Sequence, residues 1–377
     1  MSKSQARLSY EIYEDYRPYQ REWLEEVQIN RDFYNNKQWT EREAAILRRR
    51  GQAPITNNRI YPACRLKHAQ MRQHRPSLRA TPVDTTEQED LAKSELYTSL
   101  LQYVLQRNRF DQIDSVVKFD HIIDGIGYYH VQIDPHADNG AGEVELGSLA
   151  CDVVFVDPFS KKPDFSDARH IVISQKFPLE YSKYLFPNHK RKLSRIAGAD
   201  GGDTYADFTV TDLHSEENVI LPGDLEGSTG FLHGDTSWIR IIERYSKIRV
   251  RHWLVTDPSG FFAELTDEEF KAGYAQVPGI RKRPLNKTKI LKVVSAHANE
   301  AHTVLWTEVL PLDTYPIIPA VNVWNRTPFP YSDVTQMRGP QIEMNKARSL
   351  ALLNMQSLNS PKWLHEEGAV DPRIWDK

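Results

Sequence analysis

The spacing of apolar residues predicts helices in the first third of the 377-residue chain. Helical periodicity runs through residues 10–36, 40–50 and 58–74, and residues 86–124 have the spacing of two further helices. Thr40 and Glu43 form a capping box before the second of these, and Gly51 supplies its C-terminal stop. The chain therefore begins with a mostly helical part.

From residue 126 onward the pattern changes to short apolar runs separated by Gly, Pro, Asn and Asp, which is typical of strands. Strands are predicted at residues 126–133, 151–158, 169–177, 238–255, 289–296, 302–310 and 316–324, with an earlier one at 77–83. Residues 197–236 are rich in Gly, Asp, Ser and Thr and are predicted to be a long polar loop. Together the two parts indicate an α+β fold.

Five prolines between residues 316 and 340 predict a stiff connection into a final helix over residues 337–359. The apolar positions of that helix go round it instead of forming one stripe, and polar residues lie between them. Such a mixture suits a helix with like neighbours on two sides and water or a polar ligand on a third, as in a ring of subunits around a channel. An irregular surface helix is the alternative.

Composition and charge leave the class of protein open. The net charge is -3, yet residues 1–80 carry 16 Lys and Arg against 9 Asp and Glu, so the remainder is acidic. The basic part could bind nucleic acid or acidic neighbours, or it could be solvated helix faces. No apolar run is long enough for a membrane span and no signal peptide is recognisable, so we expect synthesis in the cytoplasm.

Motifs for catalysis are missing. The phosphate-binding pattern GxxxxGK[ST] is absent, and Gly125-Ile126-Gly127 follows a helix and enters a strand, which favours a tight turn over a dinucleotide loop. Cys64 and Cys151 lie far apart without metal-binding spacing and are predicted to be buried thiols. We therefore expect no enzyme activity, no cofactor and no metal.

A metal site is the one catalytic alternative that the residues allow. Carboxylates and imidazoles, the ligands of a nuclease-type cation, gather between residues 120 and 138. The set comprises Asp120, His121, Asp124, His130, Asp134, His136 and Asp138. The preferred interpretation is a polar strand face followed by a loop, but a metal-dependent nuclease using Asp120, Asp124, His130 and Asp134 stays open.

Two stretches alternate basic and apolar or polar residues, at 244–255 and 281–289. Alternation of this kind is also what a half-exposed strand produces. No nucleic-acid-binding module can be placed on these residues, so sequence-specific recognition is not expected.

Taken in order, six segments resemble the portal proteins of tailed double-stranded DNA bacteriophages, in particular the short-tailed branch. FYNNKQW at residues 33–39 is similar to the family's FYxGxQW signature, and residues 48–83 are similar to its stretch around NRI and RQNRP. The collinear likeness continues through residues 119–133, 156–171, 315–322 and 329–352. Asn36 and Ser332 stand where the family often has Gly; Asn tolerates positive φ, whereas Ser332 leaves the turn into the helix open.

The resemblance implies a portal-like wing domain followed by a stem helix that lines a tunnel. The divisions are a helical wing part at 1–125, an α+β wing part at 126–328, a stem helix at 329–360 and the start of a clip region at 361–377. Portal proteins continue with a second stem helix, a tunnel-loop helix and a crown. We expect either that the sequence is truncated or partly covered, or that a separate chain supplies this C-terminal part.

The implied function is a structural head-to-tail connector. The resemblance implies that twelve subunits form a ring at one capsid vertex of the virion, and that DNA is packaged and ejected through it without sequence specificity. The implied partners are the terminase large subunit, a tail adaptor, and the major capsid and scaffold proteins, with no membrane. Another head-completion or adaptor protein is the structural alternative.

Candidate residues follow from this resemblance. A conduit should not grip DNA strongly, and only Arg338, Lys346 and Arg348 are basic on the predicted stem helix. The candidates for contact with the tunnel or a neighbouring subunit are Arg338, Gln341, Asn345, Lys346 and Arg348. The candidates for the interface with terminase or adaptor are Trp363, Arg373 and Trp375.

Overall fold

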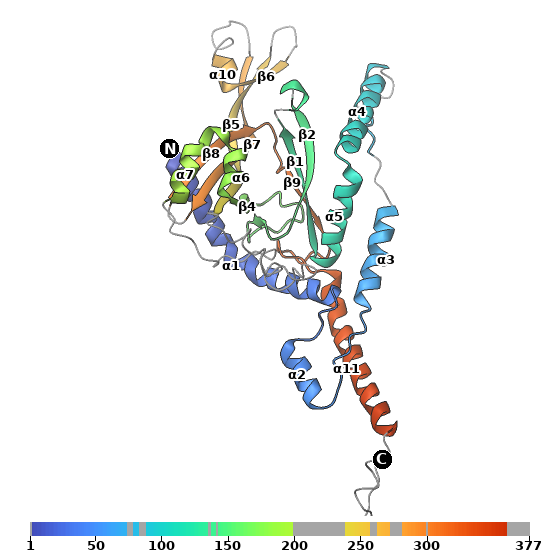
Figure 1. The fold of residues 1–377 in the computed structure, drawn as a ribbon. Coiled ribbons are helices and arrows are strands. Elements are labelled where there is room, and N and C mark those ends of the chain that lie inside the picture. The colour runs from blue at the N-terminus through green and yellow to red at the C-terminus, as the bar shows by residue number, and fades with distance from the viewer. Residues whose placement is uncertain are drawn as a thin grey trace, which may run out of the picture.

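The computed structural model describes residues 2–73, 78–82, 88–134, 137–140, 142–198, 238–256, 262–271, 281–298 and 301–359. Five helices come first, and the last element is a long helix that runs away from the body (Figure 1). These helices are α1 (Ser2–Tyr34), α2 (Glu41–Arg49), α3 (Ile60–Gln73), α4 (Gln88–Arg107), α5 (Phe110–Ile123) and the final α11 (Asp333–Asn359). Among the described residues, no helix is long and apolar enough to cross a membrane.

Two antiparallel sheets occupy the middle of the chain. The smaller sheet has the order β2-β1-β9, and the larger has the order β3-β4-β5-β7-β8 with β6 paired to β5. The strands are β1 (Ile126–Asp134), β2 (Glu143–Leu149), β3 (Val154–Val156), β4 (His170–Pro178), β5 (Trp238–Thr256), β6 (Phe262–Thr266), β7 (Arg281–Ala298), β8 (Ala301–Leu310) and β9 (Ile317–Val321). Short helices lie between them: η1 (Asp138–Gly140), α6 (Leu179–Leu185), η2 (Pro187–His189), α7 (Lys190–Gly198) and α10 (Asp267–Glu269). The α+β fold class predicted from the sequence is confirmed.

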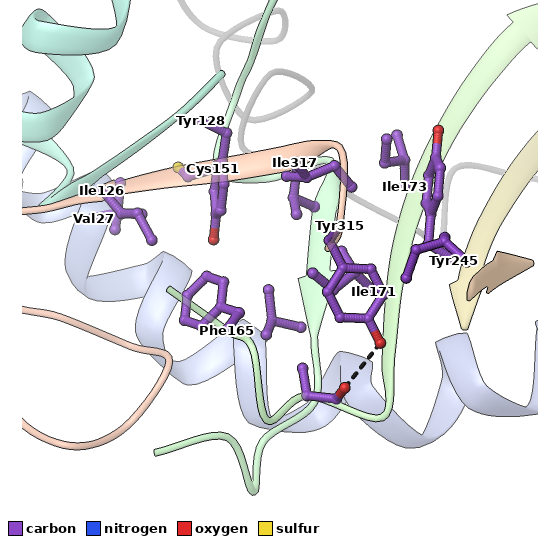
Figure 2. Close-up of a cluster of buried hydrophobic side chains, with 14 residues drawn as sticks. Val27, Ile126, Tyr128, Cys151, Phe165, Ile171, Ile173, Tyr245, Tyr315 and Ile317 are labelled. Carbon is purple, nitrogen blue, oxygen red and sulfur yellow. Dashed lines mark hydrogen bonds between the residues drawn. The ribbon is translucent and has the colours of Figure 1, made fainter. Parts of the chain in front are cut away.

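The main core lies where the two sheets and α1 meet. Ile126, Tyr128 and Ile317 from the small sheet face Ile171 and Tyr245 from the large one (Figure 2). Other members are Val27 on α1 and Phe165 and Tyr315 from connecting segments. The Tyr315 hydroxyl donates a 2.8 Å hydrogen bond to the carbonyl of Ala168, which satisfies its polar end inside the core.

A second cluster holds the helices together at the start of α11. Phe33 of α1, Ile60 and Cys64 of α3, Ile122 of α5 and Val334 of α11 are all buried in it. The final helix therefore begins at a well-packed junction with α1, α3 and α5.

The turn between α5 and β1 requires glycine at both predicted positions. Gly125 has φ +92°, which L side chains rarely adopt. A Cβ on Gly127 would stand 2.4 Å from the carbonyl oxygen of Val117, because β1 lies directly against α5. The prediction of a tight turn here is confirmed.

Several predicted elements differ in extent or kind. The capping box of Thr40 and Glu43 is present before α2, but α1 begins at Ser2 instead of residue 10, and α11 begins at Asp333 instead of residue 337. The strand predicted at 77–83 is wrong for residues 78–82, which have no regular structure; the backbone N–H of Ala80 donates to the hydroxyl of Thr98 on α4 instead. β2, β6, α6 and α7 were not predicted. The predicted long loop falls almost wholly outside the described residues.

Candidate stem helix and its buried anchor

The first turn of α11 is capped by Ser332. The Ser332 side chain accepts a 3.2 Å hydrogen bond from the backbone N–H of Thr335, as an N-cap residue does. Asn30 of α1 donates to the same hydroxyl and to that of Thr335, both at 3.0 Å. The serine therefore fixes the start of α11 and ties it to α1.

Three polar side chains on α11 bind the connection between α2 and α3. Gln341 Oε1 accepts from the backbone N–H of Arg59, Asn345 Oδ1 accepts from that of Asn57, and Ser349 Oγ accepts from that of Ile55. The donor–acceptor distances are 3.0, 3.0 and 3.4 Å. We call Gln341, Asn345 and Ser349 the polar ladder.

The spacing of the polar ladder matches the geometry of the two segments. Four helical residues rise about 6 Å, and two residues of extended chain cover about 6.6 Å. A helix that presents a polar side chain every fourth residue can therefore meet every second N–H of an extended segment. The two segments run antiparallel, since position 59 pairs with 341 and position 55 with 349.

The ladder continues into a buried network. Gln341 donates to the carbonyl of Asn57 at 2.8 Å and to Asn345 Oδ1 at 3.0 Å. Asn345 donates to Gln38 Oε1 at 2.6 Å, and Gln38 donates to the carbonyl of Phe33 at 2.9 Å. Gln341 and Asn345 are 2% and 1% exposed, so this network carries the hydrogen bonds that water would otherwise make.

The predicted site residues separate into distinct groups in the structure. Gln341 and Asn345 are turned into the subunit because their amides hold residues 57–59. Arg338 donates to Glu26 of α1 at 2.5 Å, whereas Lys346 and Arg348 are exposed and form no ion pair with a described residue. Trp363, Arg373 and Trp375 lie outside the described residues.

The C-terminal part of α11 extends away from the body (Figure 1). Beyond Ser349 it exposes apolar side chains. Leu350, Leu352, Met355 and Leu358 are 50%, 36%, 60% and 81% exposed. At 3.6 residues per turn these four positions spread over more than half of the helix circumference. Exposed apolar residues concentrated on one element mark an interaction site.

A groove of about 640 Å³ lies between α3 and α11. Ile60, Ala63, Cys64, Met337 and Met344 are among its lining residues, and Lys67 and Asp333 form an ion pair within it. Burial raises the pKa of the Cys64 thiol to about 11, which opposes formation of the nucleophilic thiolate. Both cysteines are buried and free, as predicted.

The candidate metal ligands are not brought together. Asp124 is buried and forms a two-point ion pair with Arg31 of α1, at 2.8 and 2.6 Å. His130 lies 3.4 Å from the Tyr245 hydroxyl, and His136 is outside the described residues. No cluster of three or more His, Cys, Asp or Glu with metal-binding arrangement occurs within the described ranges. The nuclease alternative gains no support.

Asp120 next to this pair has an unusual environment. Burial raises its pKa from 3.8 to about 7, the Asp124 carboxylate adds to the shift, and Arg31 opposes it. The group lies where α5 meets α1, away from any cluster of ligands. Asp120 is therefore a structural carboxyl group whose charged form is disfavoured by burial and by the neighbouring Asp124.

The role of the polar ladder was not predicted, although the spacing of its residues in the sequence carries a signal for it. Polar residues at 341, 345 and 349 recur every fourth position, which places them on one face of the helix. That periodicity indicates a polar stripe, but the N–H groups that pair with it lie nearly 300 residues earlier.

Comparison with known proteins agrees with the sequence resemblance. A search of curated proteins finds no match. The family model described as phage P22-like portal protein matches residues 10–377, which is nearly the whole chain. Portal proteins are structural components of phage virions that act in DNA packaging. The chain belongs to the P22-like family of phage portal proteins.

Proposed function

We propose that this chain is the subunit of a portal ring at one capsid vertex and that α11 forms part of the wall of its DNA conduit. The observation that carries the proposal is the surface of α11. The helix is anchored to the body at its N-terminal end, and its lower half, residues 350–359, exposes Leu350, Leu352, Met355 and Leu358. A lone helix with this surface is unfavourable in water. In a ring, each copy would bury its apolar sides against two neighbours.

Within such a ring, Lys346 and Arg348 are the cations of α11 left for DNA or for a neighbouring subunit. Arg338 is paired with Glu26, and Gln341 and Asn345 are occupied by the buried hydrogen-bond network. A small number of free cations, two per subunit, is compatible with a conduit. Each phosphate contact adds to the salt-dependent affinity for DNA, and a high affinity would slow the sliding of DNA. Trp363, Arg373 and Trp375 remain the sequence-based candidates for the face that meets terminase and the tail adaptor.

Native mass measurement and negative-stain imaging of the purified chain test the proposal. Closed rings with a central hole, with about twelve subunits as the resemblance implies, are expected. A chain that stays monomeric alone, and joins only a ring preformed by another protein, would identify it as an adaptor instead.

A further inference from the structure

The two basic stretches of the sequence lie side by side in the structure. Their strand pairing runs from Arg249 opposite Thr288 to Thr256 opposite Arg281. The second stretch, 281–289, precedes the point where β8 begins to pair with β7 at Ile290. This end of the large sheet therefore consists of residues 248–256, 262–266 and 281–289, which we call the basic ribbon.

The basic ribbon projects from the body. β7 is mostly exposed over residues 281–289 and mostly buried from Ile290 onward. The ribbon reaches out at the opposite end of the molecule from the last turn of α11 (Figure 1). A ligand of the ribbon therefore binds far from the side chains of the proposed conduit wall.

Positive charge dominates the ribbon. The ribbon contains seven Lys and Arg residues and one carboxylate, Glu264, which is paired with Lys287. Arg249, Arg281 and Arg283 are exposed and form no ion pair with any residue in the described part of the chain. On β7 the cations at 281, 283, 287 and 289 share one face, since side chains alternate along a strand and every second residue advances about 6.7 Å. The result is a row of cations on one face of β7, whereas Arg249 and Arg251 of β5 lie on the other face.

The end of the ribbon is held by aromatic packing. Trp253 stacks on Phe270 with 4.3 Å between ring centroids, and its indole N–H donates to Asp267 at 2.8 Å. The guanidinium of Arg251 lies 4.6 Å from the centroid of the Trp253 ring. Such packing presents the cations on a rigid support and lowers the entropy cost of binding.

We propose that the basic ribbon binds the phosphate backbone of duplex DNA, without sequence specificity and outside the conduit. The partner is identified by charge complementarity, because a row of cations on one face of β7, with Arg281 and Arg283 unpaired among the described residues, suits a ligand with a regular row of negative charges. Lys and Pro on an exposed edge strand also prevent sheet-to-sheet aggregation, and that role alone would give no DNA affinity. The proposal relies on the proposed function only for the presence of DNA near the subunit.

Covalently closed circular duplex DNA separates this surface from the conduit, because a closed circle cannot thread through a preassembled ring. The affinity of the full-length protein for such a circle is measured against salt concentration. The test variant carries Arg281→Gln, Arg283→Gln and Lys289→Gln, three cations on the same face of β7. The matched control carries Arg48→Gln, Arg49→Gln and Arg50→Gln, which removes three exposed arginines at and after the end of α2.

We expect the parent and the control to bind the circle and the ribbon variant to bind it at least about tenfold more weakly. The slope of log affinity against log salt should fall by about 2.7 in magnitude, for three phosphate contacts. Failure of the parent to bind, or equal loss in the control, would overturn the proposal. Unchanged DNA binding with loss of binding to poly-glutamate would overturn it in favour of an acidic protein partner.

The same titration remains informative if the proposed function fails. A parent that never forms rings but binds the circle through the three substituted cations would retain the ribbon assignment and refute the ring. Rings that form but do not bind the circular DNA would refute the DNA-binding role of the basic ribbon and leave the proposed ring intact.

Discussion

Asn345 on α11 donates a 2.6 Å hydrogen bond to Gln38, a residue 307 positions earlier in the chain. Both side chains are buried, and both also bond to backbone groups. The orientation of the final helix is therefore fixed by polar contacts of defined geometry, not only by the apolar cluster at its start. A helix that must present a fixed face to a neighbour benefits from such an anchor.

Asn345→Ala is expected to destabilise the folded chain by about 1 to 3 kcal/mol, because the N–H of Asn57 and the Oε1 of Gln38 would be buried without this partner. Urea-induced unfolding measures the change. Asn354→Ala, on the exposed part of the same helix, is the matched control and should change the free energy of unfolding by less than about 0.5 kcal/mol. Equal effects of the two variants would contradict the assigned role of the network.

Ser332→Ala removes the N-cap of α11 and the acceptor of Asn30. A lost cap of this kind costs about 1 to 2 kcal/mol. Thermal unfolding should show a lower melting temperature for this variant, while Ser357→Ala in the last turns of the same helix should melt like the parent. A normal melting temperature for Ser332→Ala would show that the hydroxyl does not hold the helix start.

Gly127→Ala is expected to be severely destabilising, by about 3 kcal/mol, because the added methyl group would press on the Val117 carbonyl and force β1 away from α5. Gly147→Ala on the paired strand β2 has open space around its Cβ and serves as the control. Soluble yield and the urea midpoint of the two variants distinguish them. Similar midpoints would mean that α5 and β1 do not make this close contact.

Asp120 makes stability depend on pH in a direction opposite to that of an ordinary paired carboxylate. Its folded-state pKa of about 7 lies above the usual 3.8, so the folded chain binds the proton more tightly than the unfolded chain. Stability contributed by this group is complete below about pH 4 and is lost as the pH rises through 7, by up to about 4 kcal/mol. Asp120→Asn should therefore be more stable than the parent at pH 8 and similar to it at pH 4.

Melting temperatures at the two pH values test this expectation. Asp111→Asn replaces an exposed carboxylate at the start of the same helix and should give no comparable gain at pH 8. A gain for Asp120→Asn that is equal at both pH values would trace the effect to packing and not to the proton.

Local signals in the sequence predicted the local parts of the fold. The capping box at Thr40 and Glu43 and the tight turn at Gly125 depend on a few neighbouring residues, and the structure confirms both. Pairings between distant segments could not be predicted in this way. Nothing near Arg249 indicates that it lies opposite Thr288, and nothing near Gln341 indicates that Arg59 is its partner.

The same distinction explains the elements that were missed. β2 has a weak alternation, Glu143 to Leu149, and it forms because β1 offers it an antiparallel edge. Residues 78–82 have the composition of a strand, but no strand in the described part of the chain pairs with them, and Ala80 bonds to α4. The candidate site shows the same distinction: the final helix was recognisable from its pattern, whereas the inward direction of Gln341 and Asn345 depended on remote contacts.

The exposed lower half of α11 gives the sharpest test of the proposed ring. Met355→Asp and Leu358→Asp place charges on side chains that are 60% and 81% exposed in the single subunit, so the folded monomer should retain its melting temperature. If neighbouring copies bury these positions, each charge loses its hydration without gaining a partner, and assembly should fail. Native mass measurement would then find monomers where the parent forms rings. Gln356→Asp adds the same charge at an exposed position outside the apolar arc, and rings that tolerate it but not Leu358→Asp would locate the contact on the apolar side of α11. Rings that tolerate all three substitutions would place the subunit contacts elsewhere and leave α11 without neighbours.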